Sequence, residues 1–126
     1  MTAARDRGSA VVDFVLVGGL LVLLFVAVLQ LALVLHVRNE LIDSAAQGAR
    51  YGALAGHGPQ DGAARTRELV SAELSARYAA DVSAQRQDAG GVALVDVQIA
   101  APLPIVGLLG PSGRLVVHGH APVEGP

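Results

Sequence analysis

The hydrophobic residues of the chain are concentrated in one block near its N-terminus. From Phe14 to Leu35 every side chain is apolar except that of Gln30, and most are Val or Leu. At about 1.5 Å per residue, a helix of this length spans roughly 33 Å, which is enough to cross the hydrocarbon core of a bilayer. A small domain cannot bury a helix that is apolar on all sides. The pattern therefore predicts one membrane-spanning helix.

The helix is expected to continue beyond the apolar block, over residues 38–54. Small and apolar side chains recur at helical spacing along one side of this segment. They are Leu41, Ala45, Gly48 and Gly52, with Ala46, Ala49 and Ala53 beside them. Such small residues let another element approach closely. We expect that element to be the C-terminal part of the same chain, and a contact with another subunit is the alternative.

A second helix is predicted after a break. The Gly- and Pro-rich segment 56–62 interrupts the first helix. Residues 63–80 follow with an apolar stripe at helical spacing, formed by Val70, Leu74 and Tyr78. This pattern indicates a short amphipathic helix that lies on another part of the module.

Two strands are predicted in the last third of the chain, over residues 92–100 and 114–121. In the first, Val95 and Val97 alternate with Asp96 and Gln98, which is typical of a strand with one buried face. A turn is expected over residues 88–91. Because a two-stranded hairpin is marginal in water, we expect it to pack on the second helix.

A loop is predicted between these strands, because residues 102–113 are rich in Pro and Gly. Several of its side chains are nevertheless apolar: Leu103, Ile105, Val106, Leu108 and Leu109. The loop either covers the small core or docks on a membrane or a partner. Together the elements predict an α+β chain, in which a long N-terminal transmembrane helix extends into a small module with a second helix and a β-hairpin.

The composition excludes several classes of function. The net charge is −2 and no basic cluster occurs beyond Arg5 and Arg7, so the chain lacks the electrostatic signature of nucleic-acid binding. It has no Cys, which excludes disulfides, thiolate chemistry and Cys-based metal sites. No nucleophile elbow or phosphate-binding loop occurs. We therefore expect neither an enzyme, nor a cofactor, nor a small-molecule substrate.

Two histidines are the one weak indication of a metal site. His118 and His120 stand two apart on a predicted strand and so point to the same face. Zinc sites need one or two more ligands, and only His57 and Glu124 are loosely plausible additions. Two exposed histidines on an edge strand are the commoner situation, and we predict no metal.

The residues just before the apolar block carry the most information. A short basic segment ends in Gly8, and Ser9 follows it. Five residues after Gly8, an isolated acid, Asp13, precedes Phe14 at the edge of the apolar helix. A carboxylate at the bilayer centre costs about 2.5–3.5 kcal/mol on insertion scales. A residue that carries this cost calls for a functional explanation. The plainer alternative is that Asp13 is simply an acid in the first turn of the helix, where the helix dipole favours a negative charge.

In this junction the chain resembles prepilins, and among them the TadE-like pseudopilins of the tight-adherence (type IVc) pilus system. A second segment supports the resemblance, because it is similar to the family's AAREGARYA segment. It reads Ala45-Ala46-Gln47-Gly48-Ala49-Arg50-Tyr51-Gly52-Ala53. The resemblance covers roughly residues 5–54.

The resemblance implies a structural role in pilus assembly. A prepilin peptidase would cut between Gly8 and Ser9, and the Asp13 carboxylate would then pair with the new terminal amine of a neighbouring subunit. The family usually has Glu at this position, so Asp13 is one methylene shorter. Residues 1–8 would be the leader, 9–37 the transmembrane and assembly helix, and 38–126 the extracytoplasmic module.

The implied partners are the membrane, the prepilin peptidase, other pilin-like subunits and the pilus assembly platform. We expect a single-pass protein of the cytoplasmic membrane with its N-terminus in the cytoplasm, which enters the surface pilus as a minor subunit. The alternative is an unprocessed membrane-anchored binding or scaffold module at a secretion site. A cleaved secretory signal is disfavoured, because the apolar block is long and no small-x-small site follows it.

Overall fold

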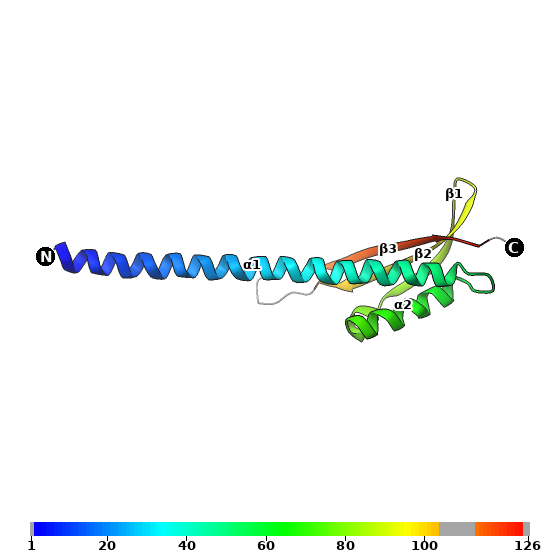
Figure 1. Cartoon of the computed structure of the whole chain (residues 1–126), viewed down its shortest axis with the longest axis horizontal. Helices are drawn as coiled ribbons and strands as arrows, with labels where there is room; N and C mark the ends of the chain where they lie inside the picture. Colours follow the sequence, from blue (N-terminus) through cyan, green and yellow to red (C-terminus); the bar gives the residue numbers. More distant parts are fainter. Residues whose placement is uncertain (1, 104–112, 125–126) are drawn as a thin grey trace. The chain divides into compact units, whose positions relative to one another are not determined.

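The computed structural model describes the backbone of residues 2–103 and 113–124, with side chains from residue 5 onward in these ranges. The described elements are α1 (Thr2–Gly52), α2 (Pro59–Glu73), a 3₁₀ turn η1 (Ala76–Ala79), β1 (Val82–Ala89), β2 (Val92–Pro102) and β3 (Arg114–Pro122) (Figure 1). The chain divides into two compact units, Met1–Leu33 and Val34–Pro126. The expected α+β class is confirmed, with a third strand added to the sheet.

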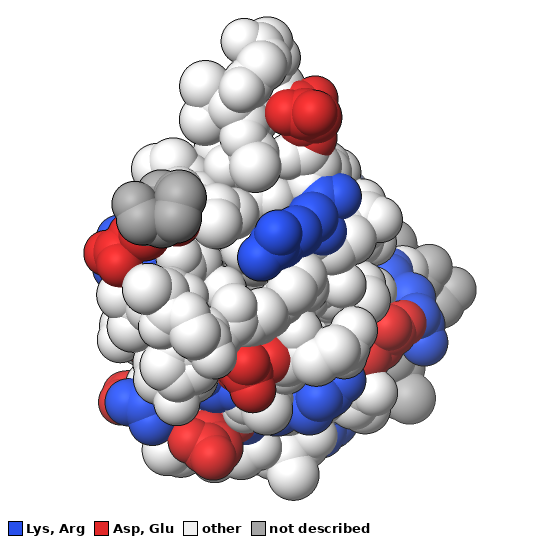
Figure 2. Space-filling view, turned by 90° about the vertical axis from the view of Figure 1, so that its right-hand side faces the viewer, with Lys and Arg blue, Asp and Glu red and all other residues white. Residues whose placement is uncertain are grey.

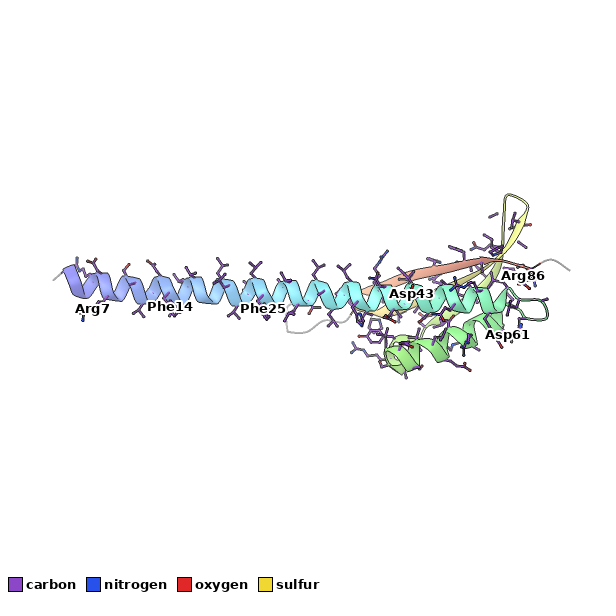
Figure 3. All side chains as sticks on the ribbon, viewed as in Figure 1. Arg7, Phe14, Phe25, Asp43, Asp61 and Arg86 are labelled. Atoms are coloured by element: carbon purple, nitrogen blue, oxygen red, sulfur yellow. The ribbon has the colours of Figure 1, made fainter. Side chains whose placement is uncertain are left out.

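The first unit consists of the N-terminal part of α1. Its apolar side chains project away from the helix on all sides, as Phe14 and Phe25 do in Figure 3. The side chains from Val11 to Leu35 include a long series of Val, Leu and Phe that remain exposed. The helix is long and apolar enough to cross a membrane, and none of its most apolar window is buried within the protein.

A tight reversal joins α1 to α2 in the second unit. After α1 ends at Gly52, Gly56 adopts a φ of +84°, which glycine tolerates best. Pro59 is the first residue of α2, where its missing N–H costs no hydrogen bond. The Asp61 carboxylate accepts a hydrogen bond of 2.8 Å from the Gly58 N–H. These residues begin the helix at Pro59, four residues before the predicted start at residue 63.

The predicted second helix is also too long at its other end. Leu74 leaves the helical conformation, with φ −119° and ψ −91°, and η1 follows it. Tyr78 therefore lies on the 3₁₀ turn rather than on a continuous stripe with Val70. The chain has to leave the helix here because β1, which begins at Val82, pairs with β2. Tertiary pairing overrides the local helical pattern.

The sheet is antiparallel with the order β1-β2-β3. The predicted hairpin corresponds to β2 and β3, whose register places Asp96 opposite His120 and Gln98 opposite His118. The predicted turn between β1 and β2 is formed by Gly90 and Gly91, with φ of +61° and +86°. Two successive positive φ values are typical of a type I′ turn, whose twist matches that of the flanking strands.

β1 is the one strand that the sequence does not predict. Its sequence, VSAQRQDA, has only Val82 buried, and the alternation of apolar and polar residues is absent. It becomes a strand because its whole length pairs with β2, from Val82 opposite Ile99 to Ala89 opposite Val92. The tip of this hairpin projects beyond the end of β3, which pairs with β2 only as far as Leu94 (Figure 1).

The core lies between the inner face of the sheet and the two helices. Its largest buried apolar side chains come from α1, α2 and β2: Leu41, Val70, Val95, Val97 and Ile99. The side chains between them are mostly alanines, and the backbones of the helices and the sheet therefore come close together. The apolar loop residues Ile105, Val106, Leu108 and Leu109 lie outside the described residues, so their expected covering or docking role stays a prediction.

Candidate functional site

The four residues of the predicted processing and assembly site all lie on α1. Gly8 and Ser9 are exposed, and a methyl group added at Gly8 would meet nothing within 4 Å. Asp13 is exposed as well, and Phe14 is 79% exposed. Ser9 and Asp13 are four residues apart, so they occupy the same face of the helix about one turn from each other. The structure thus leaves this face open to a partner.

Asp13 is an isolated charge. Within the described residues, the ion pairs involve other groups, and no basic side chain neutralises this carboxylate. The apolar stretch that begins with Phe14 follows directly. A carboxylate at the edge of an exposed apolar helix is costly once the helix enters a low-dielectric environment, unless a cation accompanies it.

The small residues of α1 in the second unit serve intramolecular packing. Gly48 faces α2, where a methyl group on it would overlap Thr66 and come within 2.7 Å of the Gly62 carbonyl oxygen. Ala45 and Ala49 are fully buried. The expectation that this face packs against the C-terminal part of the chain is therefore confirmed.

The outer face of the sheet carries a second polar site, centred on Asp96. This residue lies on the central strand, and its side chain is only 4% exposed. The Nδ1 atoms of His120 and His118 lie 2.9 Å and 3.4 Å from its Oδ1 atom. The two imidazole rings are parallel, with centroids 6.0 Å apart. The carboxylate is thus held between two partly exposed histidines.

Sequence reasoning found the two histidines but missed the role of Asp96, which it placed only on the polar side of the strand. The role of Asp96 could have been predicted by pairing β2 with β3, because the antiparallel register puts Asp96 beside both histidines. The suggested extra ligands lie elsewhere: His57 contacts the ring of Tyr51, and Glu124 accepts a hydrogen bond from the Ala55 N–H. Within the described residues, no group of three or more His, Asp or Glu side chains is arranged to hold a metal ion.

Charges on the module are mixed. On the face drawn in Figure 2, arginines alternate with acidic side chains. Among the ion pairs of the module, Arg65 pairs with Glu68 on α2, and Arg114 pairs with Asp81 at 2.7 Å. This face therefore presents no field of one sign.

Among the described residues, one exposed helix is long and apolar enough to cross a membrane, and the same chain carries a small α+β module, a combination typical of proteins that a helix anchors in a membrane. Residues 8–50 match the family model described as TadE-like protein. The match confirms the resemblance to the TadE-like pseudopilins over this segment. It supports, in general terms, the view that the chain is a pilin-like component of the tight-adherence pilus. Members of this family are structural components of the pilus and are not known as enzymes. No curated protein and no solved structure matches the chain.

Proposed function

We propose that this chain is a minor, TadE-type pilin-like subunit, which is cut after Gly8 and assembles through its N-terminal helix. The proposal is supported by the family match, whose first residue is Gly8 and which continues through the apolar helix to Arg50. The module that follows is larger than the short major pilins of this system, which favours a minor or priming role.

The observation that carries the proposal is the position of Asp13. Its carboxylate is exposed, unpaired within the described residues, and one helical turn from Ser9. Cleavage after Gly8 would make the Ser9 nitrogen a terminal ammonium on the same helix face. A neighbouring helix displaced by about one turn would bring its ammonium level with this carboxylate. In a low dielectric each charge would then compensate the other.

The partners follow from this arrangement. The prepilin peptidase acts on the N-terminal segment from the cytoplasmic side, and the assembly platform and other pilin-like subunits receive the processed helix. The second unit lies outside the cytoplasm, and the processed subunit becomes part of the surface pilus. The charges give this orientation little support, because Arg5 and Arg7 before the apolar helix are matched by Arg38 and Arg50 after it.

The proposal is tested by the intact mass of the protein extracted from membranes. In a strain with an active prepilin peptidase, we expect a mass that lacks residues 1–8, and in a strain without the peptidase, the full-length mass. The full-length mass in both strains would overturn processing at Gly8.

A second function is favoured by one structural feature. α1 continues without a break through Gly8 and Ser9, and a helical peptide has to unwind before a peptidase can cut it. An unprocessed membrane anchor that carries a binding or scaffold module needs no such unwinding. The same mass measurement separates the two functions, because the anchor keeps residues 1–8 in both strains.

A further inference from the structure

We propose that the pocket beside Asp96, on the outer face of the sheet, binds the guanidinium group of an arginine presented by a neighbouring protein chain. This inference concerns the second unit alone. It does not depend on cleavage after Gly8, and the two can fail separately.

The pocket lies where β1 and β2 run side by side. Its lining residues are Ser83, Ala84, Gln85, Asp96 and Gln98. In the strand register Gln85 is opposite Asp96 and Ser83 is opposite Gln98, so these four side chains share one face of the sheet. The helices pack on the other face, where β3 lies against α1. The pocket is therefore open to a partner within the described part of the chain.

The charge of Asp96 is the reason to expect a cationic ligand. Both close contacts of its carboxylate are made by Oδ1, to the imidazoles of His118 and His120. No arginine lies within ion-pair distance of it among the described residues. A carboxylate that is almost fully buried is costly unless it is paired and hydrogen-bonded. The two imidazoles neutralise this charge only when they are protonated, and an incoming cation would supply a permanent counter-charge.

The size of the pocket limits that cation to one side-chain head group. Its volume is about 90 Å³. Pockets for small-molecule ligands usually measure about 300–1,000 Å³, whereas one water takes about 30 Å³ in the liquid. The site can therefore take a single head group and is too small for a substrate or a cofactor.

The lining favours a guanidinium over an ammonium. Beside the carboxylate, the Ser83 hydroxyl and the Gln85 and Gln98 amide carbonyls can all accept hydrogen bonds. A guanidinium offers five N–H donors in a planar fork and is less strongly hydrated than an ammonium. It can use several acceptors at once, which a compact ammonium does less well.

The test uses the full-length, ¹⁵N-labelled protein in detergent micelles. Methylguanidinium chloride is titrated while amide chemical shifts are recorded, with methylammonium chloride and sodium chloride at the same ionic strength as controls. We expect saturable shifts confined to residues around Asp96, a dissociation constant in the millimolar range, and weaker binding of methylammonium. Shifts equal to those caused by sodium chloride would overturn the proposal.

Two variants locate the effect. Asp96→Asn should weaken methylguanidinium binding by about tenfold or more, because it removes the charge and keeps the shape. The matched control Asp88→Asn changes an exposed acid near the tip of the same hairpin and should leave binding unchanged. Equal binding to Asp96→Asn and the unchanged protein would refute the site.

If Asp96→Asn does not fold, the variant Gln85→Arg tests the binding site in its place. This variant places a guanidinium opposite Asp96 within the same chain. It should fold and lose the response to added methylguanidinium. An undiminished response in Gln85→Arg would show that the ligand binds elsewhere.

Discussion

Gly119 on β3 lies directly against the backbone of Ala45 on α1. A methyl group added at Gly119 would overlap the Ala45 carbonyl group and the Ala46 nitrogen, which are main-chain atoms that cannot rotate away. Both Gly119 and Ala45 are buried. The sheet and α1 thus approach as closely as their backbones allow, and Gly119 permits this approach.

Gly119→Ala should therefore destabilise the module. Overpacking a close-packed interior costs about 1–3 kcal/mol, and here the overlap is with backbone rather than with a flexible side chain. The loss is measured by urea unfolding of the full-length protein in detergent micelles, followed by circular dichroism. The matched control is Gly113→Ala, whose methyl group would meet, among the described residues, only the flexible end of Leu103 at 3.3 Å. Equal stability of the two variants would contradict this view of the interface.

Gly48→Ala tests the second close contact, between α1 and α2. The new methyl group would meet Thr66 and the Gly62 carbonyl oxygen, so we expect a loss of about 1–3 kcal/mol in the same unfolding experiment. Alanine has the higher helix propensity, by about 1 kcal/mol, which would stabilise the variant if space were free.

Gly18→Ala is the control for that substitution, because nothing lies within 4 Å of the position where its methyl group would be. It should leave the unfolding of the module unchanged. A Gly48→Ala variant as stable as the Gly18→Ala variant would mean that α1 and α2 are less tightly packed than the structure indicates.

The sequence predicted the helical part of this architecture well, for physical reasons. An apolar block as long as Phe14–Leu35 has few alternatives to a spanning helix, and small residues at helical spacing identify the packed face that contains Ala45 and Gly48. Helical periodicity is a local property. It can therefore be read without knowing what the helix contacts.

The parts that were missed depend on pairing between distant segments. β1 has little apolar alternation of its own and becomes a strand through β2. The site at Asp96 exists only because the register of β2 and β3 places this residue beside His118 and His120. The bounds of α2 were shifted for a similar reason, since the start of β1 limits its end. The proposed processing site at Gly8 depends on a second protein, the prepilin peptidase, and therefore does not follow from the fold of this chain.

Gly8→Leu should block removal of residues 1–8. The position has no neighbours that a larger side chain would disturb, so the variant should still fold and insert. The expected result is the full-length mass in a strain with active prepilin peptidase. The control Gly19→Leu makes the same change within the apolar helix, also with no neighbours, and should be processed normally. A normally processed Gly8→Leu variant would count against this cleavage site.

Asp13→Ala should leave membrane insertion intact or improve it, because a carboxylate near the bilayer is unfavourable there. Incorporation into pili should nevertheless be lost, since the terminal ammonium of the neighbouring subunit would enter a low-dielectric environment without a counter-charge. Quantitative immunoblotting of sheared pili and of membrane fractions measures both quantities in the same cells. Asp13→Glu keeps the charge and should retain incorporation, and Asp6→Ala removes an acid that cleavage would discard, so it should have no effect. Pili that contain Asp13→Ala at the normal level would rule out the pairing, because the carboxylate would then be dispensable in the environment where its neutralisation matters most.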